Sequence, residues 1–168
     1  MTPLTPIEAL ERQEQELVFE SFDEETAHLV GQALRMAANT RKASVAIDIR
    51  SSDRRYFYSA LSGTNPNNEE WARRKGNVVL RCHASSYLVK MRLGKEGKAA
   101  WPDAALEIKD YAVDGGGFPV RVRGSGVIAS IAVSGLPSHE DHDIIVSVLA
   151  KHLGVSAMAP TPVPDLAV

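Results

Sequence analysis

A run of eight residues, Val127–Ser134, constrains the fold more than any other part of the sequence. It is apolar or small at every position, which indicates a strand buried on both faces. Such a strand lies at the centre of a sheet. Shorter segments with apolar or aromatic alternation are expected to supply its neighbours, namely Leu17–Phe22, Ser44–Ile49, Tyr56–Leu61 and Val120–Arg123.

Helix signals alternate with these strands. Thr5–Glu8 reads Thr-Pro-Ile-Glu, which combines a cap, a proline at the first helical position and a glutamate that reaches back to the cap. We expect this helix to extend to Glu16. Asp23 is expected to cap a second helix that ends near Thr40.

Two further helices are predicted in the second half of the chain. Asn67 or Asn68 is expected to cap a long helix that continues through the serines after Cys82 and on toward Leu93. The last helix is expected to begin with a capping box formed by Ser138 and Asp141.

The order is helix, strand, helix, two strands, helix, two strands, helix, with several short hairpins. This order predicts an α+β domain whose central sheet is largely antiparallel, has about five strands and is flanked by helices. We assign residues 1–155 to one domain and expect residues 156–168, with three prolines, to form a mobile tail.

Composition excludes several classes of protein. Hydrophobic residues make up 44% and charged residues 24% of the 168, as in an ordinary soluble domain. No apolar run approaches the ~18 residues of a membrane span, so we expect no membrane insertion. The N-terminus lacks the basic and apolar regions of a signal peptide. A single cysteine, Cys82, favours the reducing cytoplasm and is expected to pack inward.

Charge is unevenly distributed along the chain. Residues 1–40 carry a net charge of −6, residues 41–98 carry +8 and residues 99–168 carry −4. The basic middle segment either pairs with the acidic flanks or forms an anion site. We expect no nucleic-acid partner, because the chain as a whole is slightly acidic.

The third helix holds the densest group of polar side chains. Arg74, Asn77 and Arg81 follow one face, and Trp71 and Lys75 lie on the adjacent face. Such a set can bind a carboxylate or phosphate. The alternative is a solvated basic face that pairs with acidic neighbours.

Two histidines at the start of the last helix are spaced so that both could bind one metal ion. His139 and His142 are three residues apart, and His83, Asp114 or Glu107 would have to supply a third ligand for zinc. The alternative is that this stretch only starts the helix. A divalent metal is therefore one candidate cofactor.

The run Gly115–Gly117 lacks the residues of a phosphate-binding loop, so we expect a tight turn that can line a pocket. Cys82 could be activated by the neighbouring Arg81 and His83, although an inert inward-facing thiol is the alternative.

Three stretches carry longer motifs. They are Gly63–Tyr87, which contains Gly-Thr-Asn-Pro-Asn-Asn and Trp-x-Arg-Arg-Lys; Asp110–Pro119; and Val133–His142, which contains Val-Ser-Gly-Leu-Pro. In this order they resemble an uncharacterised bacterial and fungal family related to the haem-degrading (HbpS-like, GlcG-like) superfamily. The resemblance implies a profilin-like domain that assembles into a homo-oligomer, an octamer or similar. Some distant relatives bind or degrade haem.

The sequence departs from this family pattern at four positions. Asp114 stands where a histidine is common, which would favour a harder cation or a hydrogen-bonding role. Cys82 replaces an aromatic residue, Asn67 an aspartate and Ala129 a glycine.

The leading hypothesis is an oligomeric protein that binds a small, anionic ligand, either haem or a carboxylated metabolite. The residues expected to bind it are Trp71, Arg74, Lys75, Asn77 and Arg81, with Gly115, Gly116, Phe118, Asp141 and His142 closing the pocket. For haem, His83 or His142 would be the axial ligand.

Two other classes of function remain open. In an enzyme, His142 oriented by Asp141 would act as general base on a carboxylated substrate, with or without a metal at His139 and His142. In a scaffold or chaperone accessory protein, the same motifs would only build the oligomer.

Overall fold

The central strand of the sheet is β5 (Gly126–Ser134), as its two apolar faces predicted. It pairs antiparallel with β4 (Gly117–Val122) and β2 (Ala46–Arg50), and β3 (Arg55–Ala60) extends the sheet beyond β2. The short β1 (Val18–Phe19) lies parallel to β4 at the other edge. The computed structural model describes residues 2–164. The predicted α+β fold, with a five-stranded and largely antiparallel sheet, is confirmed.

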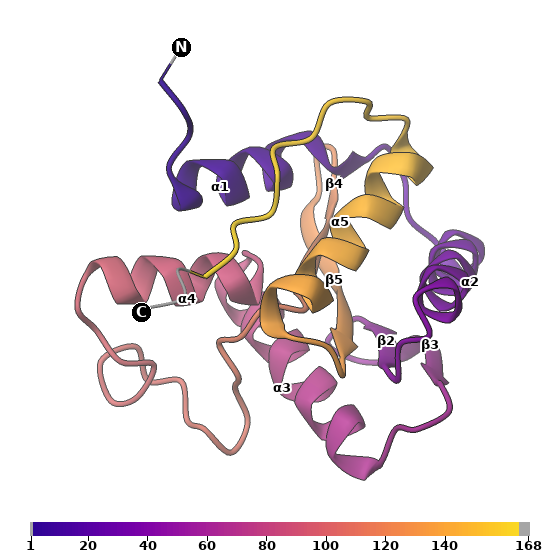
Figure 1. Cartoon of the computed structure of the whole chain (residues 1–168), viewed down its shortest axis with the longest axis horizontal. Helices are drawn as coiled ribbons and strands as arrows, with labels where there is room; N and C mark the ends of the chain where they lie inside the picture. Colours follow the sequence, from indigo (N-terminus) through magenta and orange to yellow (C-terminus); the bar gives the residue numbers. More distant parts are fainter. Residues whose placement is uncertain (1, 165–168) are drawn as a thin grey trace.

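Helices cover both faces of the sheet (Figure 1). On one face α2 (Glu24–Thr40) and α5 (Ser138–Leu153) bury the main hydrophobic core. On the other face lies α3 (Pro66–Cys82), which approaches closely because Gly76 has no side chain to meet Ser130. No helix within residues 2–164 is long and apolar enough to cross a membrane.

A second apolar cluster lies where α1 (Pro6–Glu16) and α4 (Ser86–Lys95) pack together. The segment after α5 runs back over these helices. The Ala159 carbonyl accepts a hydrogen bond from Gln13, and the Pro162 carbonyl accepts one from Tyr87. Residues 156–164 thus contact the domain, and residues 165–168 of the predicted mobile tail lie outside the described residues.

The first two helices begin as the sequence predicts. Thr5 and Glu8 form both hydrogen bonds of a capping box, and α1 ends at Glu16. The Asp23 side chain accepts a hydrogen bond from the Thr26 N–H at the start of α2. These caps depend only on neighbouring residues, which is why the sequence identifies them.

The single long helix predicted after Asn67 is wrong, because two helices occupy this stretch. α3 ends at Cys82, and His83 adopts a left-handed conformation with φ of 53°. Ser85 then caps α4 by accepting a hydrogen bond from the Leu88 N–H. The prediction of an inward-facing Cys82 is also wrong, since this last residue of α3 is exposed.

Two predicted caps are wrong as well. Asn65 caps α3, and Asn68 serves as the third residue that closes the box. Pro137 precedes α5 and gives it no side-chain cap. Ser138 instead accepts a hydrogen bond from the Gly115 N–H, and Asp141 turns toward α3. Ser138 and Asp141 thus bond to residues far along the chain and not to the helix end, and the sequence alone does not show these contacts.

Candidate functional site

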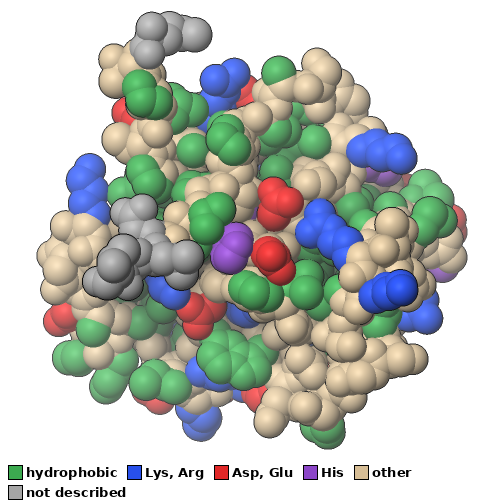
Figure 2. Space-filling view, viewed as in Figure 1, with side chains coloured by type: hydrophobic (Ala, Val, Ile, Leu, Met, Phe, Trp, Pro, Cys, Tyr) green, Lys and Arg blue, Asp and Glu red, His purple; other side chains and the backbone are tan. Residues whose placement is uncertain are grey.

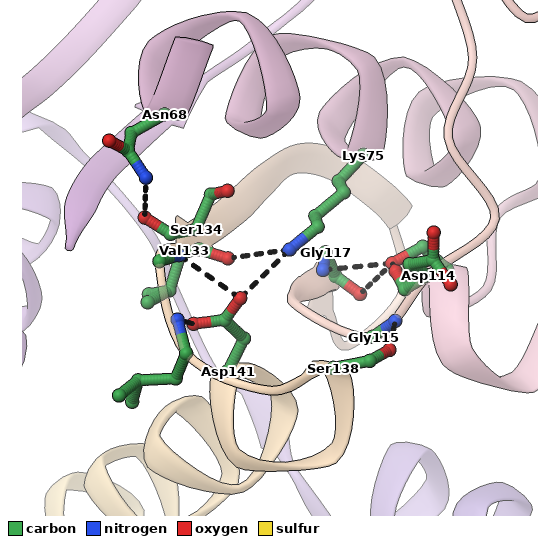
Figure 3. Close-up of polar contacts among 12 residues, drawn as sticks. Asn68, Lys75, Asp114, Gly115, Gly117, Val133, Ser134, Ser138 and Asp141 are labelled. Carbon is green, nitrogen blue, oxygen red and sulfur yellow. Dashed lines mark hydrogen bonds and ion pairs between the residues drawn. The ribbon is translucent and has the colours of Figure 1, made fainter. Parts of the chain in front are cut away.

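A cavity of about 300 Å³ lies between α3, the start of α5 and the turn that joins β5 to α5. Figure 3 shows the polar side chains that gather there. The lining residues are Asn68, Trp71 and Lys75 of α3, Ser134, Gly135 and Leu136 of the turn, Ser138 and Asp141 of α5, and Asp114.

The floor of the cavity is a buried ion pair. The Lys75 ammonium lies 2.9 Å from Asp141 Oδ2, and the two residues are only 3% and 1% exposed. The Asp141 carboxylate also accepts backbone hydrogen bonds from Gly135 at 3.3 Å and Leu136 at 3.0 Å. Burial raises the pKa of Asp141, and the charge and hydrogen bond of Lys75 oppose this shift.

The Lys75 ammonium has one donor left over. An ammonium group carries three N–H donors. One is directed to Asp141 and one to the Val133 carbonyl oxygen at 3.2 Å (Figure 3). The third has no hydrogen-bond partner within residues 2–164, and Lys75 lines the cavity. The arrangement therefore offers a buried cationic donor to a ligand.

The turn beside this pair requires glycines, because the backbone of other segments lies too close for a side chain. Gly116 has a φ of +124°, and a Cβ there would lie 2.4 Å from the Val133 oxygen and 2.8 Å from Lys75 Nζ. A Cβ at Gly115 would lie 2.2 Å from the Ser138 oxygen. The glycines thus let the turn lie directly against Lys75 and α5.

The beginning of α5 adds further donors. Pro137 supplies no capping side chain, and the N–H groups of Ser138 and His139 have no acceptor among the described residues. The first turn of a helix carries partial positive charge, which favours an anion. Ser138 lines the cavity, so this end of the helix borders the site.

The structure divides the binding residues predicted on α3. Trp71 and Lys75 line the cavity. The Arg74 guanidinium stacks on the Trp71 ring at 4.7 Å but is not part of the lining. Asn77 donates to the Asp110 carbonyl at 2.9 Å, and the exposed Arg81 lies against Tyr111. The last two therefore contact the segment before β4 and are not among the residues that line the cavity.

Phe118 and His142 lie in the hydrophobic core rather than at the cavity, and both are 0% exposed. His142 Nε2 lies 2.8 Å from Gln13 Oε1, and the imidazole ring packs between Tyr87 and Phe118. Burial lowers the pKa of His142 to about 3. This neutral, enclosed imidazole favours a structural role.

The three histidines considered as metal ligands are not brought together. His139 is partly buried on α5, His142 is in the core, and His83 lines another cavity of about 530 Å³ with Arg92 and Arg121. Within residues 2–164, no group of three or more His, Cys, Asp or Glu side chains could hold a metal ion.

Sequence reasoning missed much of the cavity wall. Ser134, Gly135 and Leu136 contribute through the turn between the last strand and the last helix. One signal could have pointed to them. A glycine followed by Leu-Pro directly after a central strand places backbone groups at the strand end beside a helix N-terminus.

The fold and the site define an α+β domain with a small polar cavity at one end of its central strand. The family model described as "Haem degrading protein HbpS-like" matches residues 22–150. The chain belongs to this family, and the predicted resemblance is confirmed.

Similar proteins span nearly the same length. A UPF0303 protein of Brucella melitensis biotype 2 is 47% identical over 148 residues, which cover 88% of each chain. A UPF0303 protein of Brucella abortus (strain 2308) matches to the same extent.

Solved structures agree on the fold. The Ybr137w protein superposes with a TM-score of 0.82 at 28% identity, covering 89% of this chain and 88% of that one. The complex of PduOC with haem has a TM-score of 0.65 at 18% identity, covering 79% of this chain and 94% of that one. At that identity the likeness concerns the fold alone.

Proposed function

We propose that the protein binds a small carboxylated metabolite in the cavity above the Lys75–Asp141 pair. The observation that carries this proposal is that the buried Lys75 lines the cavity and that one N–H of its ammonium has no partner among the described residues. A ligand carboxylate would accept from this donor and from the free N–H groups at the start of α5. Trp71, which is 40% exposed, would cover the apolar part of the ligand.

Haem does not fit this cavity. Haem iron is held in proteins by histidine, cysteine, methionine or tyrosine side chains. None of these residue types is among the residues that line the cavity. The cavity volume of about 300 Å³ is also at the lower end of ligand pockets, which favours a compact metabolite.

Charge balance sets a limit on the ligand. Asp141 already pairs with Lys75, and Asp114 on the cavity wall pairs with Lys90 at 2.6 Å. A monocarboxylate therefore suits the site better than a polyanion, because only one uncommitted ammonium N–H and one helix end favour negative charge. The exposed Cys82 thiol is compatible with the cytoplasmic location that we propose.

Intrinsic fluorescence provides a direct test. The chain has two tryptophans, so a Trp101→Phe background leaves Trp71 at the cavity as the reporter. We expect lactate, pyruvate or benzoate to change this emission with saturation. The double variant Lys75→Met/Asp141→Leu should remain folded and lose the response, because a buried pair can be replaced by apolar residues of similar size.

Two controls make the test decisive. Lys98→Met removes an exposed lysine that pairs with Glu96, and it should bind as the parent does. Native mass spectrometry of protein purified without added ligand would reveal any retained metabolite. If the folded double variant responds like the parent, Lys75 does not bind the ligand and the proposal fails.

A further inference from the structure

Charged side chains of both signs are common on the surface of this protein. Figure 2 shows acidic, basic and histidine side chains close together over α5. One acid and one base differ from these, because they line the same cavity without forming an ion pair. They are Glu14 on α1 and Arg121 on β4, and the cavity is the one of about 530 Å³ that His83 also lines.

The Glu14 carboxyl is held at the start of α4. Glu14 is 6% exposed, and its Oε1 accepts a hydrogen bond from the N–H of Ser85, the residue that caps α4. Its Oε2 has no hydrogen-bond partner within residues 2–164. Burial raises the pKa of this carboxyl to about 7, and the Ser85 hydrogen bond and the charges of Arg121 and Arg92 oppose the shift only in part. Glu14 thus lacks the cationic partner that a buried acid usually has.

The Arg121 guanidinium is held by the same turn between α3 and α4. One of its N–H groups donates to the His83 carbonyl at 3.0 Å, and His83 lies two residues before Ser85. The other guanidinium N–H groups have no partner within residues 2–164, and no carboxylate oxygen there lies within 4.0 Å of them. The β4–β5 ladder also shifts its register between Val120 and Arg121. Such irregularities change the direction of a side chain and are common beside binding sites.

The other charged side chains of the cavity leave Glu14 and Arg121 uncompensated. Glu11 of α1 and Arg92 of α4 line the same cavity, but they pair with each other at 2.8 Å. With Glu14 ionised, two glutamates balance two arginines. A ligand of zero net charge that carries both signs therefore matches the site. An anion or a cation alone would leave one of the two open groups without a partner.

We propose that this cavity binds a free amino acid, with the ligand carboxylate on Arg121 and the ligand ammonium on Glu14. A guanidinium matches a carboxylate through two parallel hydrogen bonds, and an ammonium supplies the donor that Glu14 Oε2 lacks. Glu14 and Arg121 are too far apart to pair, yet the charge of Arg121 still acts on Glu14, so a small zwitterion suits the gap.

This site is separate from the Lys75 cavity, because the two cavities share no lining residue. It also depends on α1, which lies outside residues 22–150 that the family model matches. The lining includes the apolar Val18 and Ala84, and the volume leaves room for a ligand side chain. The proposed amino-acid site therefore does not rest on the carboxylate proposed at Lys75.

Isothermal titration calorimetry of the full chain with the standard L-amino acids tests the site. We expect at least one of them to bind. Two derivatives of that amino acid then test the charges on the unaltered protein, since the N-acetyl form lacks the ammonium and the amide form lacks the carboxylate. Each should bind weaker by about tenfold or more. The proposal is overturned if no amino acid binds at millimolar concentration, or if either derivative binds as well as the parent compound.

Proton exchange on binding separates a zwitterion from an anion. Just below the Glu14 pKa of about 7, an arriving ammonium displaces the proton of the carboxyl, so binding should release protons. Titrations in cacodylate and in imidazole, which differ in ionisation enthalpy, measure this release. The other charged or titratable groups of the lining are His83, Glu11, Arg92 and Arg121, and His83→Asn should leave the release unchanged. Proton uptake would indicate an anion site and would overturn the proposal.

Variants assign the two charges to residues. Arg121→Gln and Glu14→Gln should each weaken binding by about tenfold or more, and Glu14→Gln should also abolish proton release. Arg123→Gln is the matched control, because the Arg123 side chain is 68% exposed, pairs with Glu20 and is not part of the lining. Circular dichroism and thermal melting check that the variants are folded. Full affinity in folded Arg121→Gln would overturn the proposal.

One further variant separates this site from the proposed function. Lys75→Met/Asp141→Leu alters only the other cavity, so it should bind the amino acid as the wild type does. Loss of amino-acid binding in the folded double variant would place the amino acid at the Lys75 cavity and overturn the assignment to Glu14 and Arg121.

Discussion

Asp141 and His142 are adjacent in the chain and both almost fully buried, yet they belong to different regions of the molecule. Asp141 faces α3 and forms an ion pair with Lys75 at the floor of a cavity. His142 faces α1 and α4, where its partner is the neutral Gln13. Consecutive positions on a helix differ by about 100° in direction, so one turn of α5 serves both regions.

The difference shows how burial selects a protonation state. His142 packs against two aromatic rings, and no opposite charge within residues 2–164 compensates its burial, so its pKa falls to about 3 and it stays neutral. Asp141 has a cationic partner and two backbone donors. The charged pair therefore lies beside the cavity, where each group has an opposite charge, and the imidazole in the closed core is neutral.

The largest effect should come from breaking the ion pair. Lys75→Met leaves the Asp141 carboxyl buried without its cation, which should lower the free energy of unfolding by about 3–5 kcal/mol. Urea unfolding followed by circular dichroism measures this loss. Adding Asp141→Leu should recover most of it. A double variant as unstable as the single one would mean that the cavity floor requires the charges themselves.

The next effect is on the pH dependence of stability, to which Glu14 and His142 contribute with opposite signs. Burial raises the pKa of Glu14 from 4.5 to about 7. The Glu14 side chain accepts a hydrogen bond from the N–H of Ser85, the residue before α4. Between these two values the native state keeps a proton that the unfolded chain releases. The contribution of Glu14 to the free energy of unfolding is therefore lost as the pH rises from 4.5 to 7. For His142 the sign is opposite. Its pKa of about 3 against 6.5 gives a contribution that is lost as the pH falls below 6.5.

These opposing slopes predict a specific variant behaviour. Glu14→Gln removes the Glu14 contribution and keeps that of His142, so the free energy of unfolding should rise from pH 4.5 to 6.5 more steeply than in the wild type. The Glu14 contribution corresponds to about 3 kcal/mol across its full range. Urea unfolding at several pH values measures both proteins, and Glu20→Gln, at an exposed position, is the control. Parallel pH profiles for Glu14→Gln and wild type would contradict the assignment.

A smaller loss of stability is expected when the uncharged Gln13–His142 pair is broken. Gln13→Leu removes the partner of His142 Nε2 and of the Ala159 carbonyl, which should cost about 1–3 kcal/mol. The segment after α5 should also become easier to cleave, and limited proteolysis with mass spectrometry detects this. Ligand binding at the Lys75 cavity should be unchanged. Equal protection of residues 156–164 in both proteins would show that Gln13 does not hold this segment.

The smallest effect is expected at Arg81. Its side chain is exposed and interacts with the Tyr111 side chain, so Arg81→Ala should leave urea unfolding and ligand fluorescence unchanged within error. This variant tests the sequence-based prediction that Arg81 binds the anion. Weaker binding by Arg81→Ala would move the site away from the Lys75 cavity and toward the exposed face of α3.

Much of the fold could be predicted from local signals. The apolar run of β5 identified the central strand, and the caps at Thr5 and Asp23 gave the starts of α1 and α2. The predicted long third helix was wrong because the stretch around His83 has no proline or glycine to mark a break. The turn is contacted by residues far along the chain, because Arg121 donates to the His83 carbonyl and Glu14 accepts from the Ser85 N–H.

The candidate site could be predicted only in part. Lys75, Trp71 and Asp141 were all proposed as site residues, and the structure brings them to one cavity. Helical spacing also placed Arg74, Asn77 and Arg81 together, but their directions relative to the sheet depend on how α3 packs. The spacing of His139 and His142 likewise could not show that one of them points into the core.

By itself the sequence determined the strands, most of the helices and the family, because caps, apolar periodicity and motifs act over a few residues. Only the tertiary structure decided that Lys75 meets Asp141 and that His142 meets Gln13. These contacts join residues 66 and 129 positions apart. Which side chain of α5 turns to the cavity and which to the core follows from the rotation of the helix on the sheet, and many distant contacts fix that rotation together.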